Sequence, residues 1–177
     1  MADTATGTPT STQTKVRPFR PLDHRACREL WAELTDDDRR RYDAPRQTDP
    51  GAGFEHFVAR LELSGMWVAE HAEAGVIGFV GLVLHGRRGE VDPIVVAAPY
   101  RAAGVGRALL DRVAAEARRR RLRQLSISPS TRNVDAIRAF HRAGYDVLEH
   151  LTLTLDLADS APPRRDGVDL HGLRFRY

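Results

Sequence analysis

The stretch PYRAAGVGRALLDRV, Pro99 to Val113, places an arginine and two spaced glycines immediately before an amphipathic helical pattern. The first turn of a helix has unpaired backbone N–H groups and carries the positive end of the helix dipole, so it attracts anions. The two glycines let an anion approach this backbone closely, and Arg101 and Arg107 add charge-assisted hydrogen bonds. The stretch therefore predicts a binding site for a diphosphate.

Two familiar phosphate-binding loops do not fit this stretch. It lacks the Gly-Lys-Ser/Thr ending of the usual NTPase loop, and it lacks a Gly-x-Gly-x-x-Gly followed by an acidic ribose ligand. A tight strand-to-helix turn needs glycine as well, so a purely structural role stays open at this point. The surrounding chain supplies the context that is needed to choose.

That surrounding chain predicts a mixed α/β fold. A short strand at 15–20 is followed by helical spacing at 24–34, which Asp23 can cap, and at 54–63. Three strand-like runs separated by short turns then favour antiparallel pairing; they are 66–72, 76–85 and 89–97. After them helix and strand alternate, which is typical of parallel pairing; the elements are a helix at 105–120, a strand at 123–129, a helix at 134–143 and a strand at 145–157.

The remaining segments are polar connections. Segment 35–53 is expected to be a loop or broken helix that acts as a lid on the substrate side. Within it, Asp36, Asp37 and Asp38 indicate either a cationic substrate or a helix cap. After a proline-bearing linker, LHGLRFRY (170–177) has the alternation of a last strand.

The sequence Arg101-Ala102-Ala103-Gly104-Val105-Gly106 resembles the Arg/Gln-x-x-Gly-x-Gly/Ala signature of the GNAT superfamily of acyl-CoA-dependent N-acyltransferases. The strand GEVDPIVV before it and SISPSTRNVDAIRAFHRAGY after it agree with that family in order and spacing. The resemblance implies a GNAT fold, with a central mixed, mostly antiparallel sheet, helices on both faces and a parallel join at strands four and five. It divides the chain into a disordered tail at 1–14, an N-acyltransferase domain at 15–157, and a linker with a C-terminal strand at 158–177.

The resemblance also implies acetyl-CoA as the acyl donor and a small-molecule or peptide amine as the acceptor. Main-chain groups of the fourth strand would bind the pantetheine arm, and the amide N–H of Val95 or Val96 would polarise the thioester carbonyl. The glycine loop would hold the diphosphate. Asn133 and Phe140 would line the other side of the arm. The donor-binding residues so implied are Ile94, Val95, Val96, Arg101, Ala102, Ala103, Gly104, Val105, Gly106, Arg107, Asn133 and Phe140.

Two catalytic roles need separate candidates. Glu90 and Asp92 lie two apart and so share one face of a strand, where either could take a proton from the amine. Glu90 falls at the acidic position usual in the family, and a solvated strand start is the alternative for both. Phe140 stands where many members carry the tyrosine that protonates the leaving thiolate. The acid then has to come from another group, and the candidates are Ser128, Ser130, Tyr145 and solvent.

Other function classes are less well supported by the sequence. The 27 basic residues are nearly matched by 24 acidic ones, which does not favour nucleic acid, although the run Arg118–Arg123 keeps an RNA-associated module as an alternative. The seven histidines show no metal-ligand spacing, and Cys27 fits helix packing. The chain shows no membrane-spanning apolar run or signal peptide, so a cytoplasmic protein is expected. A non-catalytic acyl-CoA sensor is the alternative that Phe140 raises, and we expect a homodimer through the region from Leu151 onward.

Overall fold

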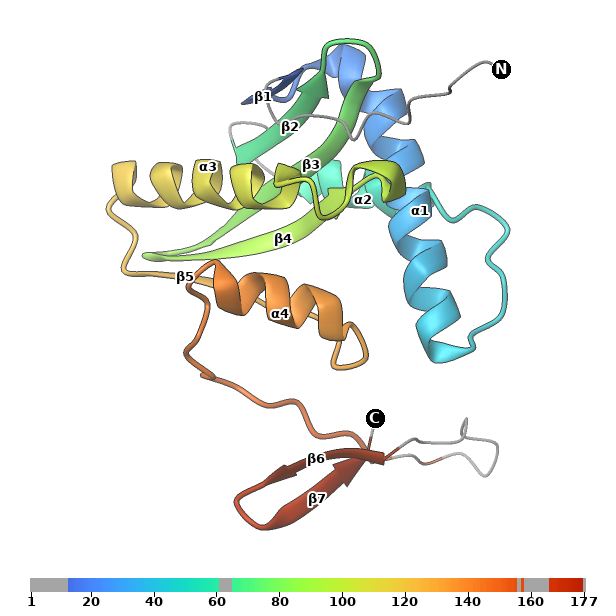
Figure 1. Cartoon of the computed structure of the whole chain (residues 1–177), viewed down its shortest axis with the longest axis vertical. Helices are drawn as coiled ribbons and strands as arrows, with labels where there is room; N and C mark the ends of the chain where they lie inside the picture. Colours follow the sequence, from blue (N-terminus) through green and yellow to red (C-terminus); the bar gives the residue numbers. More distant parts are fainter. Residues whose placement is uncertain (1–12, 61–64, 156, 158–165, 177) are drawn as a thin grey trace, which may run out of the picture.

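The computed structural model describes residues 13–60, 65–155, 157 and 166–176 (Figure 1). The expected tail up to residue 12, the end of the expected helix at 61–63 and the linker at 158–165 lie outside these residues. The elements in chain order are β1 (Thr14–Pro18), α1 (His24–Tyr42), α2 (Ala52–Arg60), β2 (Met66–His71), β3 (Gly75–His85), β4 (Arg88–Val96), α3 (Val105–Arg119), β5 (Gln124–Ile127), α4 (Val134–Arg142), β6 (Asp166–Leu170) and β7 (Leu173–Arg176).

Five of the strands form one mixed sheet in the order β1-β2-β3-β4-β5. The first four strands pair antiparallel, and β4 pairs with β5 in parallel from Arg88↔Gln124 to Val91↔Ile127. The short turns between β2, β3 and β4 enforce the antiparallel pairing, while helix α3 provides the crossover to β5. The expected fold class, including the parallel join at strands four and five, is confirmed.

The sheet lies between α3 on one face and α1 and α2 on the other (Figure 1), and each face carries an apolar layer. On one face, α1 and α2 bury Cys27, Leu30, Phe54 and Phe57 against alternate residues of β2, β3 and β4. On the other face, α3 buries its apolar stripe, and its members are Val105, Leu109, Leu110 and Val113. Side chains of successive strand residues point to opposite faces, so Val68 joins the first layer and Trp67 the second. These layers fix the height of α3 over the sheet and hence the position of its first turn.

A buried ion pair between Arg17 of β1 and Asp23 joins the sheet to the start of α1, and the half-exposed Glu70 of β2 binds the same arginine. The Arg17 guanidinium donates to both carboxylate oxygens of Asp23, at 2.7 and 2.9 Å, and to both oxygens of Glu70, at 2.9 and 2.8 Å. The arginine holds the pKa of the Asp23 carboxyl below its ordinary value. Asp23 is indeed the residue before α1, but its side chain accepts from the Arg20 N–H instead of capping the helix.

A bulge in β4 changes which of its residues face each layer. Register runs Leu82↔Val91 before the irregularity and Val80↔Ile94 after it, so Asp92 and Pro93 together oppose the single residue Gly81. A side chain at Gly81 would be impossible, because its Cβ would lie 2.4 Å from the carbonyl oxygen of Asp92. The alternation of β4 therefore shifts by one residue between its acidic start and its apolar end.

Three sequence-based expectations differ from the structure. Helix α1 continues through Tyr42, so the first part of segment 35–53 is helical rather than loop. Its three aspartates pair with the three arginines that follow at i+3, which supports the helix. Segment 145–155 is not a strand: it has no ladder partner among the described residues, and without one its alternating leucines stay exposed. The C-terminal piece forms the hairpin β6–β7, turning at His171 and Gly172, both with positive φ.

Candidate active site

A cavity of about 350 Å³ lies where the end of β4, the loop before α3, the first turn of α3 and helix α4 meet. Backbone and small side chains of the glycine loop form one wall, and α4 forms the other. The lining residues are Ile94, Ala102, Gly104, Gly106, Arg107, Leu110, Ala139, Phe140, Arg142 and Ala143. Six of the residues expected to bind the donor are therefore brought together here: Ile94, Ala102, Gly104, Gly106, Arg107 and Phe140.

The loop conformation leaves the start of α3 open toward this cavity. Gly104 is the N-cap residue with φ +86°, and no side chain in the described part of the chain caps the first turn. No described heavy atom lies within 4 Å of the place where a Cβ on Gly104 would be, and the nearest to a Cβ on Gly106 is Val96 Cγ2 at 3.8 Å. The unpaired N–H groups and this open space together fit an anion such as a diphosphate.

The backbone of β4 offers its hydrogen-bonding groups to the same region. The Ala97 N–H donates to the Ile77 carbonyl at 2.9 Å, and because hydrogen-bonded pairs alternate, Val95 turns its backbone toward β3. Ile94 and Val96 then point their N–H and C=O groups away from β3, on the side where β5 has already ended at Ile127. Of the two amides expected to polarise a thioester carbonyl, the structure thus turns Val96 and not Val95 toward the gap.

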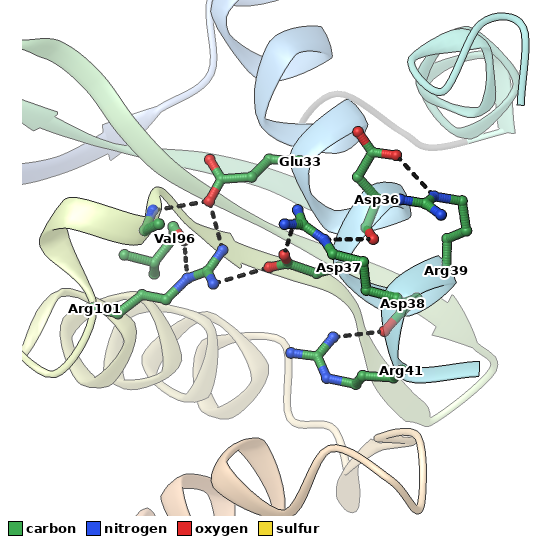
Figure 2. A network of polar contacts seen from close by, with 10 residues as sticks. Glu33, Asp36, Asp37, Asp38, Arg39, Arg41, Val96 and Arg101 are labelled. Atoms are coloured by element: carbon green, nitrogen blue, oxygen red, sulfur yellow. Dashed lines mark hydrogen bonds and ion pairs between the residues drawn. The ribbon is translucent and has the colours of Figure 1, made fainter. Parts of the chain in front are cut away.

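Arg101 does not extend into the cavity as the sequence led us to expect. Its Nε donates to the Val96 carbonyl at 2.9 Å, and its terminal nitrogens pair with Glu33 at 2.6 Å and Asp37 at 2.9 Å (Figure 2). Two acidic residues of α1 thus hold the guanidinium on the side away from the loop. Arg107, in contrast, lines the cavity, where it donates to Asp111 at 2.9 Å and to the Arg142 carbonyl at 3.2 Å.

The remaining expected donor-binding residues shape the site without lining it. Ala103 belongs to the loop backbone, and Val105 is buried in the core under α3. Asn133 caps α4: its Oδ1 accepts from the Ala136 N–H at 3.2 Å. This cap begins the helix that carries Phe140 into the cavity wall.

The alternative acids for thiolate protonation have other partners or positions. Ser128 donates to Glu90, and Ser130 is bonded to the Tyr42 hydroxyl at 2.5 Å. Tyr145 packs on Phe140 with ring centroids 6.4 Å apart, and its hydroxyl is buried with no partner among the described residues. Burial raises the pKa of Tyr145 to about 12, and the residue is not part of the cavity lining. None of these three residues lines the cavity.

Glu90 and Asp92 lie on β4 before and within the bulge. Glu90 opposes Val83, and its carboxylate accepts from Ser128 Oγ at 3.3 Å and lies 3.4 Å from His85 Nε2. Partial burial raises the pKa of Asp92, and the neighbouring negative charge of Glu90 adds to the effect, although Asp92 retains contact with solvent. Sequence reasoning missed His85, which becomes a neighbour of Glu90 only once the β3–β4 register places it diagonally across the strands.

Several candidates considered from the sequence are bound elsewhere. Asp36, Asp37 and Asp38 each pair with an arginine, and they lie inside α1, so they do not cap a helix (Figure 2). Cys27 is fully buried, which raises the pKa of its thiol to about 12. Among the residues that the structure describes, no cluster of three histidine, cysteine or carboxylate side chains could hold a metal, and no helix is long and apolar enough to cross a membrane.

Solved structures with a similar fold include several acetyltransferases. An acetyltransferase of the GNAT family from Staphylococcus aureus Mu50 is 15% identical, with a TM-score of 0.62 over 74% of this chain and 83% of that one. The ribosomal-protein-S18-alanine N-acetyltransferase from Escherichia coli is 17% identical, with a TM-score of 0.57 over 74% and 76%. Rv2747 from Mycobacterium tuberculosis, solved in complex with CoA, is 23% identical, with a TM-score of 0.55 over 79% and 76%.

Sequence comparison extends this likeness of fold to a family. A search of curated proteins found no significant match. The profile of the acetyltransferase (GNAT) family matches residues 27–145, a span that runs from α1 through the glycine loop to the residues after α4. Since this span is more than half of the chain, the protein belongs to the acetyltransferase (GNAT) family.

Proposed function

We propose that the protein is an N-acetyltransferase that moves the acetyl group of acetyl-CoA to a primary amine of a small molecule or peptide, within residues 15–157. Family membership supports acyl-CoA-dependent acetyl transfer in general. The observation that carries the specific proposal is the cavity that joins the uncapped start of α3 to the outward-facing backbone of β4. An extended donor with a diphosphate at one end and amides along its arm matches these two features.

The proposed reaction is direct attack in a ternary complex. The amine nitrogen forms a bond to the thioester carbonyl carbon, the carbon–sulfur bond breaks, and coenzyme A leaves as a thiolate that must gain a proton. Glu90 takes the proton that the amine loses, and Asp92 is the second candidate for this role. The Val96 N–H stabilises the negative charge that develops on the carbonyl oxygen.

A catalytic chain and a non-catalytic acyl-CoA sensor are separated by one pair of measurements. Calorimetry with acetyl-CoA and coenzyme A measures binding, and release of free thiol over a panel of amines measures turnover. Binding with turnover supports the enzyme, whereas binding without turnover on any amine supports the sensor, which Phe140 in the cavity wall favours. An RNA-associated module has weaker support, because Arg119 and Arg120 of the basic run are bonded to the buried Glu116.

We also propose that the protein forms a homodimer through the region from Leu151 onward. Leu151, Leu153 and Leu155 are exposed, and β5 has no described strand on its outer edge. An alternating apolar segment and an open strand edge both gain from pairing with a second chain. Deleting residues 168–177 is expected to give monomer or aggregate, and a full-length chain that sediments as a monomer at micromolar concentration would exclude the dimer.

A further inference from the structure

The side chain of Arg101 joins α1 to the end of β4 (Figure 2). Its three nitrogens have three different partners: Nε donates to the Val96 carbonyl, and the two terminal nitrogens bind Glu33 and Asp37. Glu33 and Asp37 lie four residues apart and so share one face of α1. A guanidinium can bind three groups at once because its donors are held in a rigid planar fork.

The positive charge of Arg101 is matched within this cluster. Arg40 binds the other carboxylate oxygen of Asp37, at 3.1 Å, so two carboxylates face two guanidinium groups. An anion in the cavity would therefore meet a locally neutral cluster, and one whose guanidinium points toward α1. This arrangement gives Arg101 little part in direct charge attraction.

The cluster forms hydrogen bonds with backbone groups on both sides of the end of β4. Glu33 also accepts from the Ala98 N–H at 2.9 Å, while Arg101 bonds the Val96 carbonyl, a group that β3 leaves unpaired. Ala102, the first residue of the loop to line the cavity, follows Arg101 directly. Movement of Arg101 would displace both the backbone amide proposed to face the thioester and the loop proposed to hold the diphosphate.

We propose that Arg101 is a positioning residue: together with Glu33 and Asp37 it holds the end of β4 and the glycine loop in the donor-binding geometry, without binding the diphosphate itself. This inference rests on the proposed function, because it assumes that the donor binds in the cavity. It makes α1 part of the donor site although no residue of α1 lines the cavity.

The test measures the affinity of the full chain for coenzyme A by calorimetry. A positioning role and a direct phosphate-binding role of Arg101 predict opposite changes in this affinity when its carboxylate partners are removed. In the double variant E33Q/D37N, a positioning role predicts a loss of about tenfold in affinity, the order of one lost charge-assisted hydrogen bond. If Arg101 were a direct phosphate ligand, removing its two carboxylate partners would free its side chain to reach the cavity, and the variant would bind coenzyme A more tightly. That result would overturn the proposal. R101Q should lose affinity by a similar factor, and combining all three substitutions should add little further loss.

Three comparisons exclude a general loss of structure or of charge. D36N removes only the pair with Arg39 on the same helix, so it should keep wild-type affinity. R101K keeps the charge but loses the fork, so it should bind as weakly as R101Q, and full rescue by lysine would overturn the proposal. The ratio of R101Q to wild-type affinity should stay constant as salt is raised, since a screened charge is not what is lost.

The outcomes also separate this inference from the function on which it rests. If the wild-type chain does not bind coenzyme A, the proposed function and the inference both fail. If the wild type binds and R101Q and E33Q/D37N bind equally well, only the inference fails.

Discussion

Substituting the two glycines of the glycine loop is expected to change stability in opposite directions, and only Gly104→Ala is expected to weaken donor binding. Gly106 lies in the first turn of α3, where a Cβ would meet only Val96 Cγ2 at an ordinary 3.8 Å. Replacing a helical glycine by alanine gains about 0.5–1 kcal/mol where the site accepts the methyl group. For a chain of this length, that gain raises the melting temperature by about 1–4 °C.

Gly104→Ala has the opposite expected effect on the free energy of unfolding. Its φ of +86° is left-handed, a conformation that costs alanine about 1–2 kcal/mol. In Gly104→Ala the methyl group enters the cavity beside the first N–H groups of α3 and holds the anion away from them, whereas the signature that this loop resembles accepts alanine at the position of Gly106. Loss of one charge-assisted hydrogen bond, about 1.5–3 kcal/mol, weakens coenzyme A binding by about 10–150-fold.

The assay combines thermal unfolding of the ligand-free variants with calorimetry using coenzyme A. Gly86→Ala is the matched control: Gly86 has φ +63° in the β3–β4 turn, with open space around it, and is not part of the cavity lining. It should lose stability as Gly104→Ala does and keep full affinity. Wild-type affinity in Gly104→Ala would refute the anion site, and a destabilised Gly106→Ala would refute the helical start at this position.

Three further results are expected. Glu90→Gln should lower thiol release by about 100-fold with unchanged coenzyme A affinity, and the loss should shrink as pH rises and free amine accumulates; a normal Glu90→Gln beside an inactive Asp92→Asn would reverse the roles. Phe140→Tyr should raise turnover by up to about 100-fold, because it places an acid in the cavity wall; unchanged thiol release at saturating donor would show that thiolate protonation does not limit the rate. Asp23→Asn should cost about 3 kcal/mol in urea unfolding at neutral pH, more than Glu70→Gln at the half-exposed partner of the same arginine. Since the pKa of Asp23 is lowered in the folded state, this contribution is full above the ordinary aspartate pKa of 3.8 and is lost as pH falls through the folded value, so the wild type and Asp23→Asn should converge in acid.

Most of the fold could be predicted because its signals are local. Apolar periodicity located β2, β3, β4 and α3, and short turns fixed their antiparallel order. Segment 145–155 shows the limit of this reasoning, because alternating side chains describe a strand only if a neighbouring strand offers a ladder. The helical nature of residues 36–41 was a readable signal that was missed: three aspartates followed at i+3 by three arginines support a helix.

The candidate site was predictable only in part, because its backbone directions depend on long-range register. The glycines at 104 and 106 predict an anion site from local sequence, although the surrounding chain is needed to choose it over a purely structural turn. Which amide of β4 faces the gap depends on the bulge opposite Gly81 and on the early end of β5, and neither can be read from residues 94–96.

Arg101 shows why residue type and spacing can predict a contact that the structure does not contain. An arginine at the start of a glycine loop suits a diphosphate, and no carboxylate nearby in sequence pairs with it. The competing carboxylate of Glu33 is 68 residues away and reaches Arg101 only because α1 packs across the end of β4. In the folded chain, Glu33, Asp37 and the Val96 carbonyl bind the guanidinium in fixed geometry. A diphosphate would have to lose hydrating water before it could bind the same group. The same arginine can therefore serve the anion site better by holding its walls than by reaching into it.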